Sequence, residues 1–275
     1  MSRAASRSTP TRVRPAYVDR LTDRMSERDW QIITAVNRLR VASGGQIERL
    51  CFVDVSEGRS RIVTRSRVLA RLVAWRVLVP LARRIGGAGR GSSAQLFALD
   101  TAGARLLARN QLSQGERVRV RRPGTPSERT IRHMTAVGEL YVTLVELART
   151  NGFGVNEFLT EPGCYWPNGL GGWLKPDAYT VLMRGKVLDY WWIEHDEATE
   201  SLPTIRRKIQ AYLDFWRRGQ PGPHDVVPRV LISTVTNQRR DALVGVVRRL
   251  PGAEELVTVV ESTIAAAHMT QVLRE

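Results

Sequence analysis

The sequence predicts a two-part protein of the α+β/α/β class, in which a small helical unit with a strand hairpin precedes a mixed α/β domain. Three observations predict it. Apolar residues recur at helical spacing in three successive segments before residue 76. Two short alternating segments flank a glycine-rich stretch at 86–92. Beyond residue 128, strand-like apolar runs alternate with amphipathic segments, and the 275 residues suffice for two ordinary domains.

Charge divides the chain at the same place. Residues 1–128 hold 25 Lys and Arg against 10 Asp and Glu, which accounts for the whole net charge of +15, whereas residues 129–275 hold 17 of each. This asymmetry indicates that one half meets a polyanion, of which nucleic acid is the commonest. The chain has two cysteines and only short apolar runs, so we expect a reduced, cytoplasmic protein with no membrane partner.

The first elements follow a basic tail rich in Ser, Arg and Pro, which we expect to be disordered over residues 1–18. A helix is predicted from Glu27 to Arg40, because Ser26 is a suitable N-cap and Asp29 stands three positions later. A short helix follows and ends near Cys51. The third helix is predicted over 59–75, with an apolar side made of Val63, Val68, Leu69, Leu72 and Val73.

Beyond Trp75 the pattern changes to the period of a strand. Alternation over 77–81 and again over 95–99 encloses the glycine-rich turn, and a further helix is predicted over 102–109. Three helices followed by a strand, a glycine-arginine turn and a second strand is the order of a winged helix-turn-helix. We assign this motif to residues 19–111 and a linker, rich in Pro and Arg, to 112–128.

In such a motif the third helix enters the major groove of DNA and the wing lies against the backbone. Arginine pairs bidentately with guanine, threonine reaches bases or phosphates, and an arginine at the wing tip suits the minor groove. The sequence therefore predicts contacts with double-stranded DNA from nine side chains, namely Arg59, Arg61, Thr64, Arg65, Arg67, Arg71, Arg83, Arg84 and Arg90.

The second domain is predicted over residues 129–275. Its opening helix spans 129–151 and ends before Gly152. Strands are expected at 155–160, 174–183, 187–195, 230–235 and 256–260, and helices at 203–218 and 237–250. The expected product is a mixed sheet with helices on its faces.

One polar cluster in this domain could carry chemistry. Asp177 follows Pro176 on one predicted strand, and Glu194 and Asp196 share a face of the next. Three carboxylates at one sheet edge would bind Mg²⁺ or Mn²⁺. The layout resembles the restriction-endonuclease-like fold, which places P-D on one strand and (D/E)-x-K on the next. Here Asp196 stands where that motif has lysine, and Lys208 on the following helix is the candidate substitute.

Three interpretations of this cluster stay open. The acidic residues are solvated or paired with Arg206 and Arg207, or they form a metal-dependent nuclease or nickase, or they belong to a non-cleaving scaffold. We expect no cleavage and no cofactor, since only the nuclease alternative needs Mg²⁺ or Mn²⁺. His195 is expected to pack on the opposite strand face. Four tryptophans are expected to pack in the core and loops rather than to stack on bases, namely Trp166, Trp173, Trp191 and Trp192.

Several segments, taken in order, resemble the replication-relaxation family of plasmids, phages and integrative elements. They are residues 21–28, 59–79, 97–104, 174–179, 193–201 and 208–212, and the resemblance covers about residues 20–265. It implies a role in plasmid replication and DNA relaxation and supplies no catalytic residues. We therefore expect a sequence-specific DNA-binding protein of a mobile element, acting in replication, relaxation control or transcriptional regulation. Its second domain would form a homodimer or bind a replication or relaxase protein.

Overall fold

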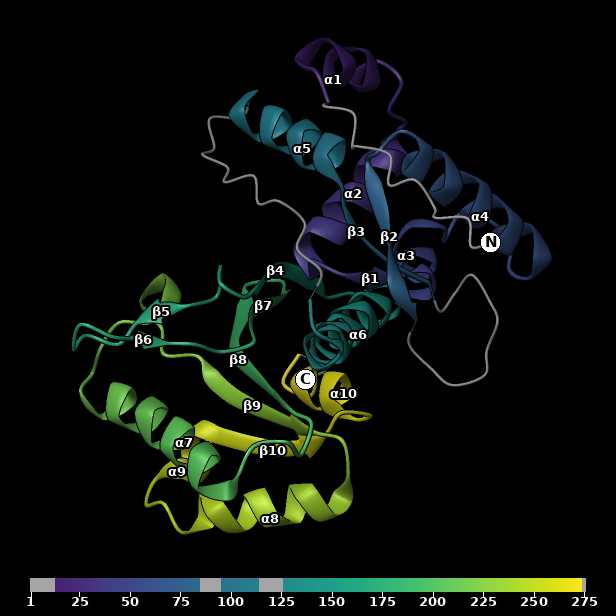
Figure 1. The fold of residues 1–275 in the computed structure, drawn as a ribbon. Helices are drawn as coiled ribbons and strands as arrows, with labels where there is room; N and C mark the ends of the chain where they lie inside the picture. The colour runs from purple at the N-terminus through teal and green to yellow at the C-terminus, as the bar shows by residue number, and fades with distance from the viewer. Residues whose placement is uncertain (1–12, 85–94, 114–125, 274–275) are drawn as a thin grey trace, which may run out of the picture.

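The computed structural model describes residues 13–84, 95–113 and 126–273 (Figure 1). Helices are combined there with a three-stranded sheet, a five-stranded sheet and a two-stranded hairpin. The predicted mixture of helices and a mixed sheet is therefore confirmed.

The N-terminal half contains helices α1 (Pro15–Thr22), α2 (Glu27–Leu39), α3 (Gly44–Cys51), α4 (Arg59–Ala74) and α5 (Thr101–Ser113), with strands β1 (Ala42–Ser43), β2 (Leu78–Arg84) and β3 (Gln95–Leu99). The strands form an antiparallel sheet in the order β1-β3-β2. Capping boxes start α2 at Ser26, as predicted, and α3 at Ser43. In each, the serine hydroxyl accepts from the backbone N–H three residues on, and the side chain of that residue accepts in return.

The predicted disordered tail is too long at its C-terminal end. Helix α1 begins at Pro15, which suits the first turn of a helix because it needs no N–H partner there. Val18 and Leu21 are buried, and the Tyr17 hydroxyl donates to the carbonyl oxygen of Trp75 at 3.0 Å. A few apolar side chains in a basic stretch were thus sufficient to dock this segment on the core. The linker prediction also began early, because α5 continues to Ser113.

The C-terminal half opens with α6 (Glu128–Asn151). It continues through β4 (Gly154–Thr160), β5 (Trp166–Pro167), β6 (Trp173–Leu174), β7 (Ala178–Arg184), β8 (Val187–Asp196), α7 (Leu202–Arg217), β9 (Arg229–Thr234), α8 (Asn237–Arg248), α9 (Ala253–Leu256), β10 (Val257–Glu261) and α10 (Ala265–Met269). The large sheet has the order β10-β9-β8-β7-β4. Strands β8, β9 and β10 are parallel, and β7 and β4 are antiparallel to their neighbours. Helices α7 and α8 cover one face, and α6 and α10 cover the other (Figure 1).

One predicted strand is divided in two. The expected strand at 174–183 is interrupted by residues 175–177, because Pro176 has no N–H to give to a strand ladder. Its first part, β6, pairs with β5 in a short hairpin that the sequence did not predict. Its second part, β7, pairs with β8 along its whole length.

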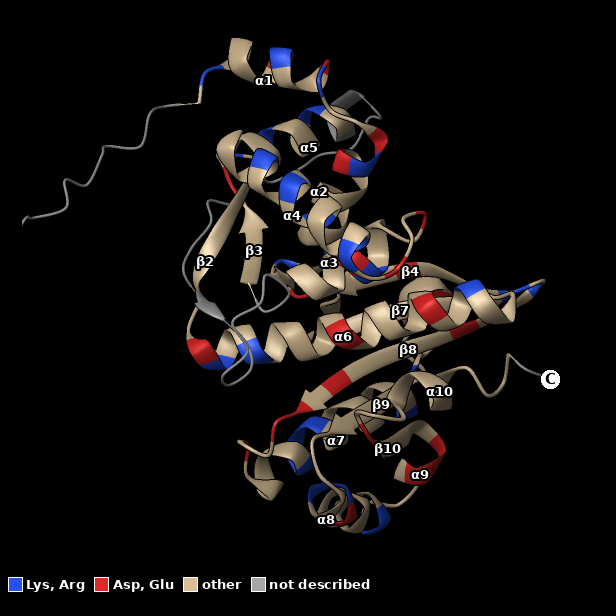
Figure 2. Ribbon diagram, turned by 90° about the vertical axis from the view of Figure 1, so that its right-hand side faces the viewer, with Lys and Arg blue, Asp and Glu red and all other residues tan. Residues whose placement is uncertain are grey.

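Helix α6 lies between the two halves (Figure 2). A single apolar core joins residues of α2 and α3, such as Leu39 and Ile47, to Leu144 of α6 and Trp191 of β8. Polar contacts add to it: the Gln46 amide donates to the carbonyl oxygen of Thr135 at 3.0 Å. The two halves therefore share one core. No helix in the described ranges has the length and apolarity that a membrane crossing requires.

Candidate functional site

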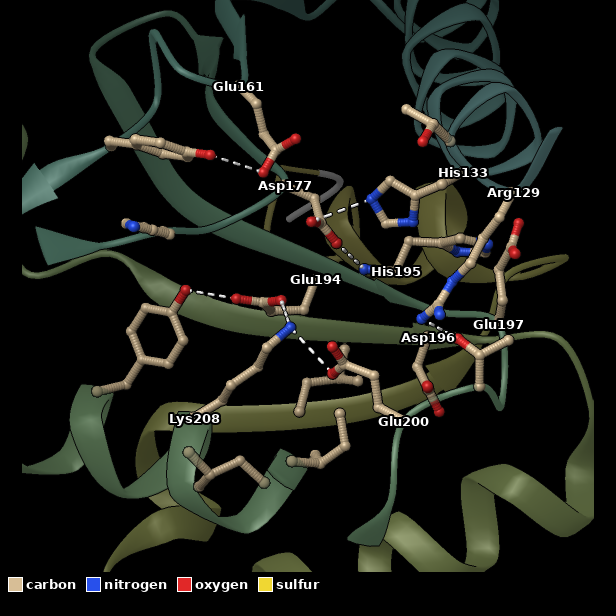
Figure 3. Close-up of a pocket in the computed structure, with 18 residues that line it drawn as sticks. Arg129, His133, Glu161, Asp177, Glu194, His195, Asp196, Glu197, Glu200 and Lys208 are labelled. Atoms are coloured by element: carbon tan, nitrogen blue, oxygen red, sulfur yellow. Dashed lines mark hydrogen bonds and ion pairs between the residues drawn. The ribbon is translucent and has the colours of Figure 1, made fainter. Parts of the chain in front are cut away.

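The predicted acidic residues lie around a cavity of about 360 Å³ at one end of the β7–β8 pair (Figure 3). The antiparallel register of β7 and β8 places Ala178 opposite Ile193, so Asp177 lies directly beside the end of β8. The backbone N–H of Asp177 continues this pairing by donating to the carbonyl oxygen of Ile193 at 2.9 Å. The expectation that these two strands bring Asp177 near Glu194 agrees with this geometry.

The Asp177 carboxylate is held by two donors. Its Oδ2 accepts from the backbone N–H of His195 at 2.7 Å, and its Oδ1 lies 3.0 Å from Nε2 of His133. His133 comes from the first turns of α6, 44 positions before Asp177, and it lines the same cavity. The hydrogen bond that His133 donates to Asp177 raises the pKa of the His133 imidazole. The sequence offers no signal for this pairing, because a single histidine on an amphipathic helix looks like any half-buried position.

Glu194 is buried at the wall of the cavity. Its carboxylate accepts from the Tyr212 hydroxyl at 2.6 Å and from Nζ of Lys208 at 3.3 Å (Figure 3). Burial, followed by the charge of Asp177, raises the pKa of Glu194 to about 7. Burial by itself lowers the pKa of Lys208. The nearby carboxylates of Glu194, Asp177 and Glu200 outweigh this effect and raise the pKa of Lys208. Lys208, the candidate substitute for the missing lysine, therefore lies between Glu194 and Glu200.

Asp196 does not join Asp177 and Glu194. Its side chain forms an ion pair with Arg239 of α8, and Arg239 also donates to the carbonyl oxygen of Glu200 at 2.6 Å. Arg206 and Arg207, which one of the three interpretations offers as partners of the acidic residues, are exposed on α7. The alternation of strand residues predicts that Glu194 and Asp196 share a face. It does not predict that Arg239 of α8 pairs with Asp196.

The acidic side chains around the cavity do not form a three-carboxylate metal site. In the described part of the chain, no group of three or more His, Cys, Asp or Glu side chains is placed to hold an ion. The oxygens of Asp177 already accept from His133 and His195, and those of Glu194 accept from Tyr212 and Lys208. Both carboxylates therefore already have protein partners.

His195 packs away from Glu194, as its alternation on the strand predicts. Its Nδ1 lies 3.0 Å from the hydroxyl oxygen of Ser233 on β9, and its ring centroid is 5.8 Å from that of His133. Burial lowers the pKa of His195, so the ring is neutral at physiological pH. The ring therefore belongs to the α6 side of the sheet.

The second candidate region is the outer face of α4. Arg59, Val63 and Arg67 recur every four residues and are exposed, so they form one stripe along the helix. Arg71 continues this stripe and pairs with the buried carboxylate of Asp29, with its Nη2 at 2.6 Å. The exposure of Val63 differs from the predicted apolar side, which in the structure consists of Leu69 and Leu72 with Val68 and Val73 beside them.

Three other predicted contact residues of α4 have different surroundings. Arg65 is 3% exposed and forms an ion pair with Glu48 of α3. Arg61 turns back toward the loop before α4 and donates from Nε to the carbonyl oxygen of Val55 at 2.8 Å. Thr64 is half-buried. In this conformation Arg61 and Arg65 engage the protein itself.

The predicted wing residues fall largely outside the described residues. Arg90 lies outside them altogether. Arg83 and Arg84 belong to the end of β2, and their side chains are not among those described.

Comparison with known proteins gives one match. A family model described as replication-relaxation matches residues 33–230, which include α4, α6 and every residue that lines the acidic cavity except Ile232. No curated protein and no solved structure matches the chain.

Proposed function

The chain belongs to the replication-relaxation family, and from that premise we propose that it binds double-stranded DNA in the replication or relaxation of a mobile element. The observation that carries the proposal is the stripe of exposed arginines on α4, in the half of the chain that holds the whole net charge of +15. A helix with this charge suits the negative potential of a DNA groove.

The order of elements supports a winged helix-turn-helix as the binding unit. Helices α2, α3 and α4 are followed by the antiparallel pair β2 and β3, which the glycine-rich segment connects. In such a motif α4 is the helix that enters the major groove. We propose that Arg59 and Arg67 contact guanine edges or phosphates, and that Val63 meets thymine methyl groups. Arg61 and Arg65 would support α4 rather than read bases.

The test measures the affinity of the full chain for a duplex by fluorescence anisotropy at several salt concentrations. Each phosphate that the protein neutralises contributes a slope of about −0.9 in log K against log salt. We expect a steep slope for the natural chain. Replacing Arg59 and Arg67 by Ala together should lower its magnitude by about 1–2 and weaken binding about tenfold or more.

The matched control is the pair Arg206→Ala and Arg207→Ala. These two arginines are also exposed on a helix, α7, but they belong to the half with no net charge. They should leave both the slope and the affinity nearly unchanged. Equal losses from the two double variants would show that charge alone, and not α4, governs binding, and the proposal would be abandoned.

A metal-dependent nuclease is the second candidate, because Asp177, Glu194 and Lys208 do meet in one cavity. A nuclease of this kind needs an ion to generate hydroxide and to stabilise the pentacovalent phosphate. The contacts of both carboxylates, together with the diversion of Asp196 to Arg239, favour a non-cleaving role. We therefore expect supercoiled plasmid to stay intact with Mg²⁺ or Mn²⁺. Nicking that Glu194→Gln abolishes would promote the nuclease to first place.

The role that we propose for residues 129–275 is self-association or the binding of a replication or relaxase protein. Their zero net charge supports it, because such a half attracts phosphates weakly on its own. Sedimentation of the full chain with and without duplex tests the homodimer. A monomer in both conditions would exclude self-association and leave the binding of a replication or relaxase protein as the proposed role of residues 129–275.

A further inference from the structure

The β5–β6 hairpin has a fixed shape. Between its strands, Oδ1 of Asn168 accepts from the backbone N–H groups of Leu170 and Gly172, both at 2.9 Å. Gly169 and Gly171 adopt φ angles of 75° and 79°, a region that suits glycine. Two hydrogen bonds to residues distant in sequence anchor the hairpin. Trp166 Nε1 donates to the carbonyl oxygen of Pro221, and Arg218 donates to that of Asn168, both at 3.0 Å.

This fixed hairpin holds large apolar side chains in solvent. Leu170 is 71% exposed and Trp173 is 57% exposed, whereas Trp191 and Trp192 are almost fully buried in the core. The expectation that all four tryptophans serve packing is therefore right for the last two and does not describe Trp173. An indole held open on a rigid loop is prepared to stack on a flat partner.

A cation two residues from Trp173 and a second aromatic ring both line the cavity. Exposure alternates from Trp173 through buried Leu174 to exposed Lys175, so Trp173 and Lys175 project to the same side of the chain. Lys175 lines the mouth of the cavity, with its Nζ 5.7 Å from the ring centroid of Tyr165, another lining residue. An aromatic surface with a lysine beside it is the pairing that single-stranded nucleic acid requires, one group for the base and one for the phosphate.

The charge of the cavity limits where such a strand can lie. Acidic side chains outnumber Lys and Arg six to three among its lining residues. A phosphate is therefore repelled from the interior and held at the rim, where Lys175 lies.

We propose that Trp173 stacks on a base of single-stranded DNA while Lys175 holds a neighbouring phosphate, at the rim of the cavity that contains Asp177 and Glu194. The inference rests on the proposed function, since it takes DNA as the natural partner of the chain. It adds a second site, selective for unpaired strands, on the half of the molecule that does not carry α4.

The test uses the full chain and a fluorescein-labelled dT₁₀ oligonucleotide, measured by anisotropy in the presence of saturating unlabelled duplex, which occupies α4. Trp173→Ala should weaken dT₁₀ binding about tenfold, the loss expected for one stacked base. Trp173→Phe should retain most of the affinity, because a phenyl ring still stacks. Binding of labelled duplex alone should be unchanged in both variants.

Leu188→Ala is the matched control, because Leu188 is 44% exposed near the start of β8, at the end of the β7–β8 pair away from the cavity, and does not line the cavity. It should bind dT₁₀ like the natural chain. In a second measurement, an oligonucleotide with 5-iododeoxyuridine is irradiated on the protein, and the adduct is expected on the peptide that contains Trp173.

The outcomes separate the two ideas. If the chain binds duplex but Trp173→Ala binds dT₁₀ normally, or the adduct forms only elsewhere, the strand site is refuted and the exposed hairpin is left to a protein partner. If the chain binds neither duplex nor dT₁₀, the proposed function itself fails.

Discussion

Arg65 and Glu48 form an ion pair inside the N-terminal half, between α4 and α3. Removing one partner of such a pair leaves the other charge poorly solvated. Because the Glu48 side chain retains 21% exposure, we expect Arg65→Ala to lower the free energy of unfolding by about 2–3 kcal/mol, measured by urea denaturation. Arg67→Ala, on the exposed side of the same helix, should change it by less than about 0.5 kcal/mol. Similar losses in both variants would contradict the buried role of Arg65.

Glu194 gives the molecule a pH dependence of known sign. Burial and the charge of Asp177 raise its pKa to about 7 against about 4.5 in the unfolded chain, while Lys208 and the Tyr212 hydroxyl act in the opposite direction. The native state therefore holds the proton more tightly. Its contribution to stability is complete below pH 4.5 and is lost as the pH rises through about 7.

Glu194→Gln tests this, because glutamine keeps the shape and does not titrate. The natural chain should lose stability relative to the variant between pH 5 and pH 8, when unfolding is followed by urea at each pH. A difference between the two proteins that stays constant over this range would show that Glu194 is ionised throughout.

Only some residues of the candidate site could be predicted from the sequence. Asp177 and Glu194 were accessible because the alternation of strand residues and the pairing of adjacent strands are local rules. His133, Tyr212 and Arg239 were not, since each reaches the sheet end from a helix whose docking depends on the whole core. The same limit applied to Arg65, whose partner Glu48 lies on α3.

Helix α5 passes so close to the backbone just before β2 that no side chain fits at Gly103. A Cβ at Gly103 would lie 2.2 Å from the backbone oxygen of Val77, so helix and strand must separate to accept it. We expect Gly103→Ala to cost on the order of 1–3 kcal/mol of stability. Gly245→Ala, inside α8 with open space around it, should instead stabilise by about 0.5–1 kcal/mol. Urea denaturation of the two variants measures both changes, and a Gly103→Ala variant as stable as the natural chain would refute the close contact.

Elements with strong periodicity could be predicted nearly to the residue. Helices α2, α4 and α6 and strands β4, β8 and β9 follow from spacing and capping. The short elements could not be predicted: α1, β5, α9 and α10 have two to eight residues and owe their form to the surface they pack on. Pro176 carried the signal for the break between β6 and β7, because it removes a ladder N–H.

The two halves are expected to unfold together, because one core runs through α2, α3, α6 and β8. Two cysteines can report the unfolding of each half. Cys51 lies in the N-terminal half and Cys164 in the C-terminal half, and both are buried. Burial raises the pKa of the Cys51 thiol to about 12 and raises that of Cys164 as well, so neither is reactive in the native state.

Pulse alkylation at increasing urea concentration should therefore label both thiols at the same midpoint. A fragment that ends at residue 111 should be less stable than the full chain, since it exposes the apolar surface that α6 covers. Labelling of Cys51 at a lower urea concentration than Cys164 would instead show two independent units.

The position of α6 also has a consequence for inheritance. Its Glu146 binds Arg49 of α3 at 2.5 Å, Gly138 lies against Leu39, and the first turns of the same helix carry His133 to the acidic cavity. A recombination event that joined the first half of one such gene to the second half of another would set a foreign helix against α2 and α3. We expect such an exchange to be tolerated only where the relative preserves the side chains through which α6 contacts α2 and α3, which favours the inheritance of the two halves together.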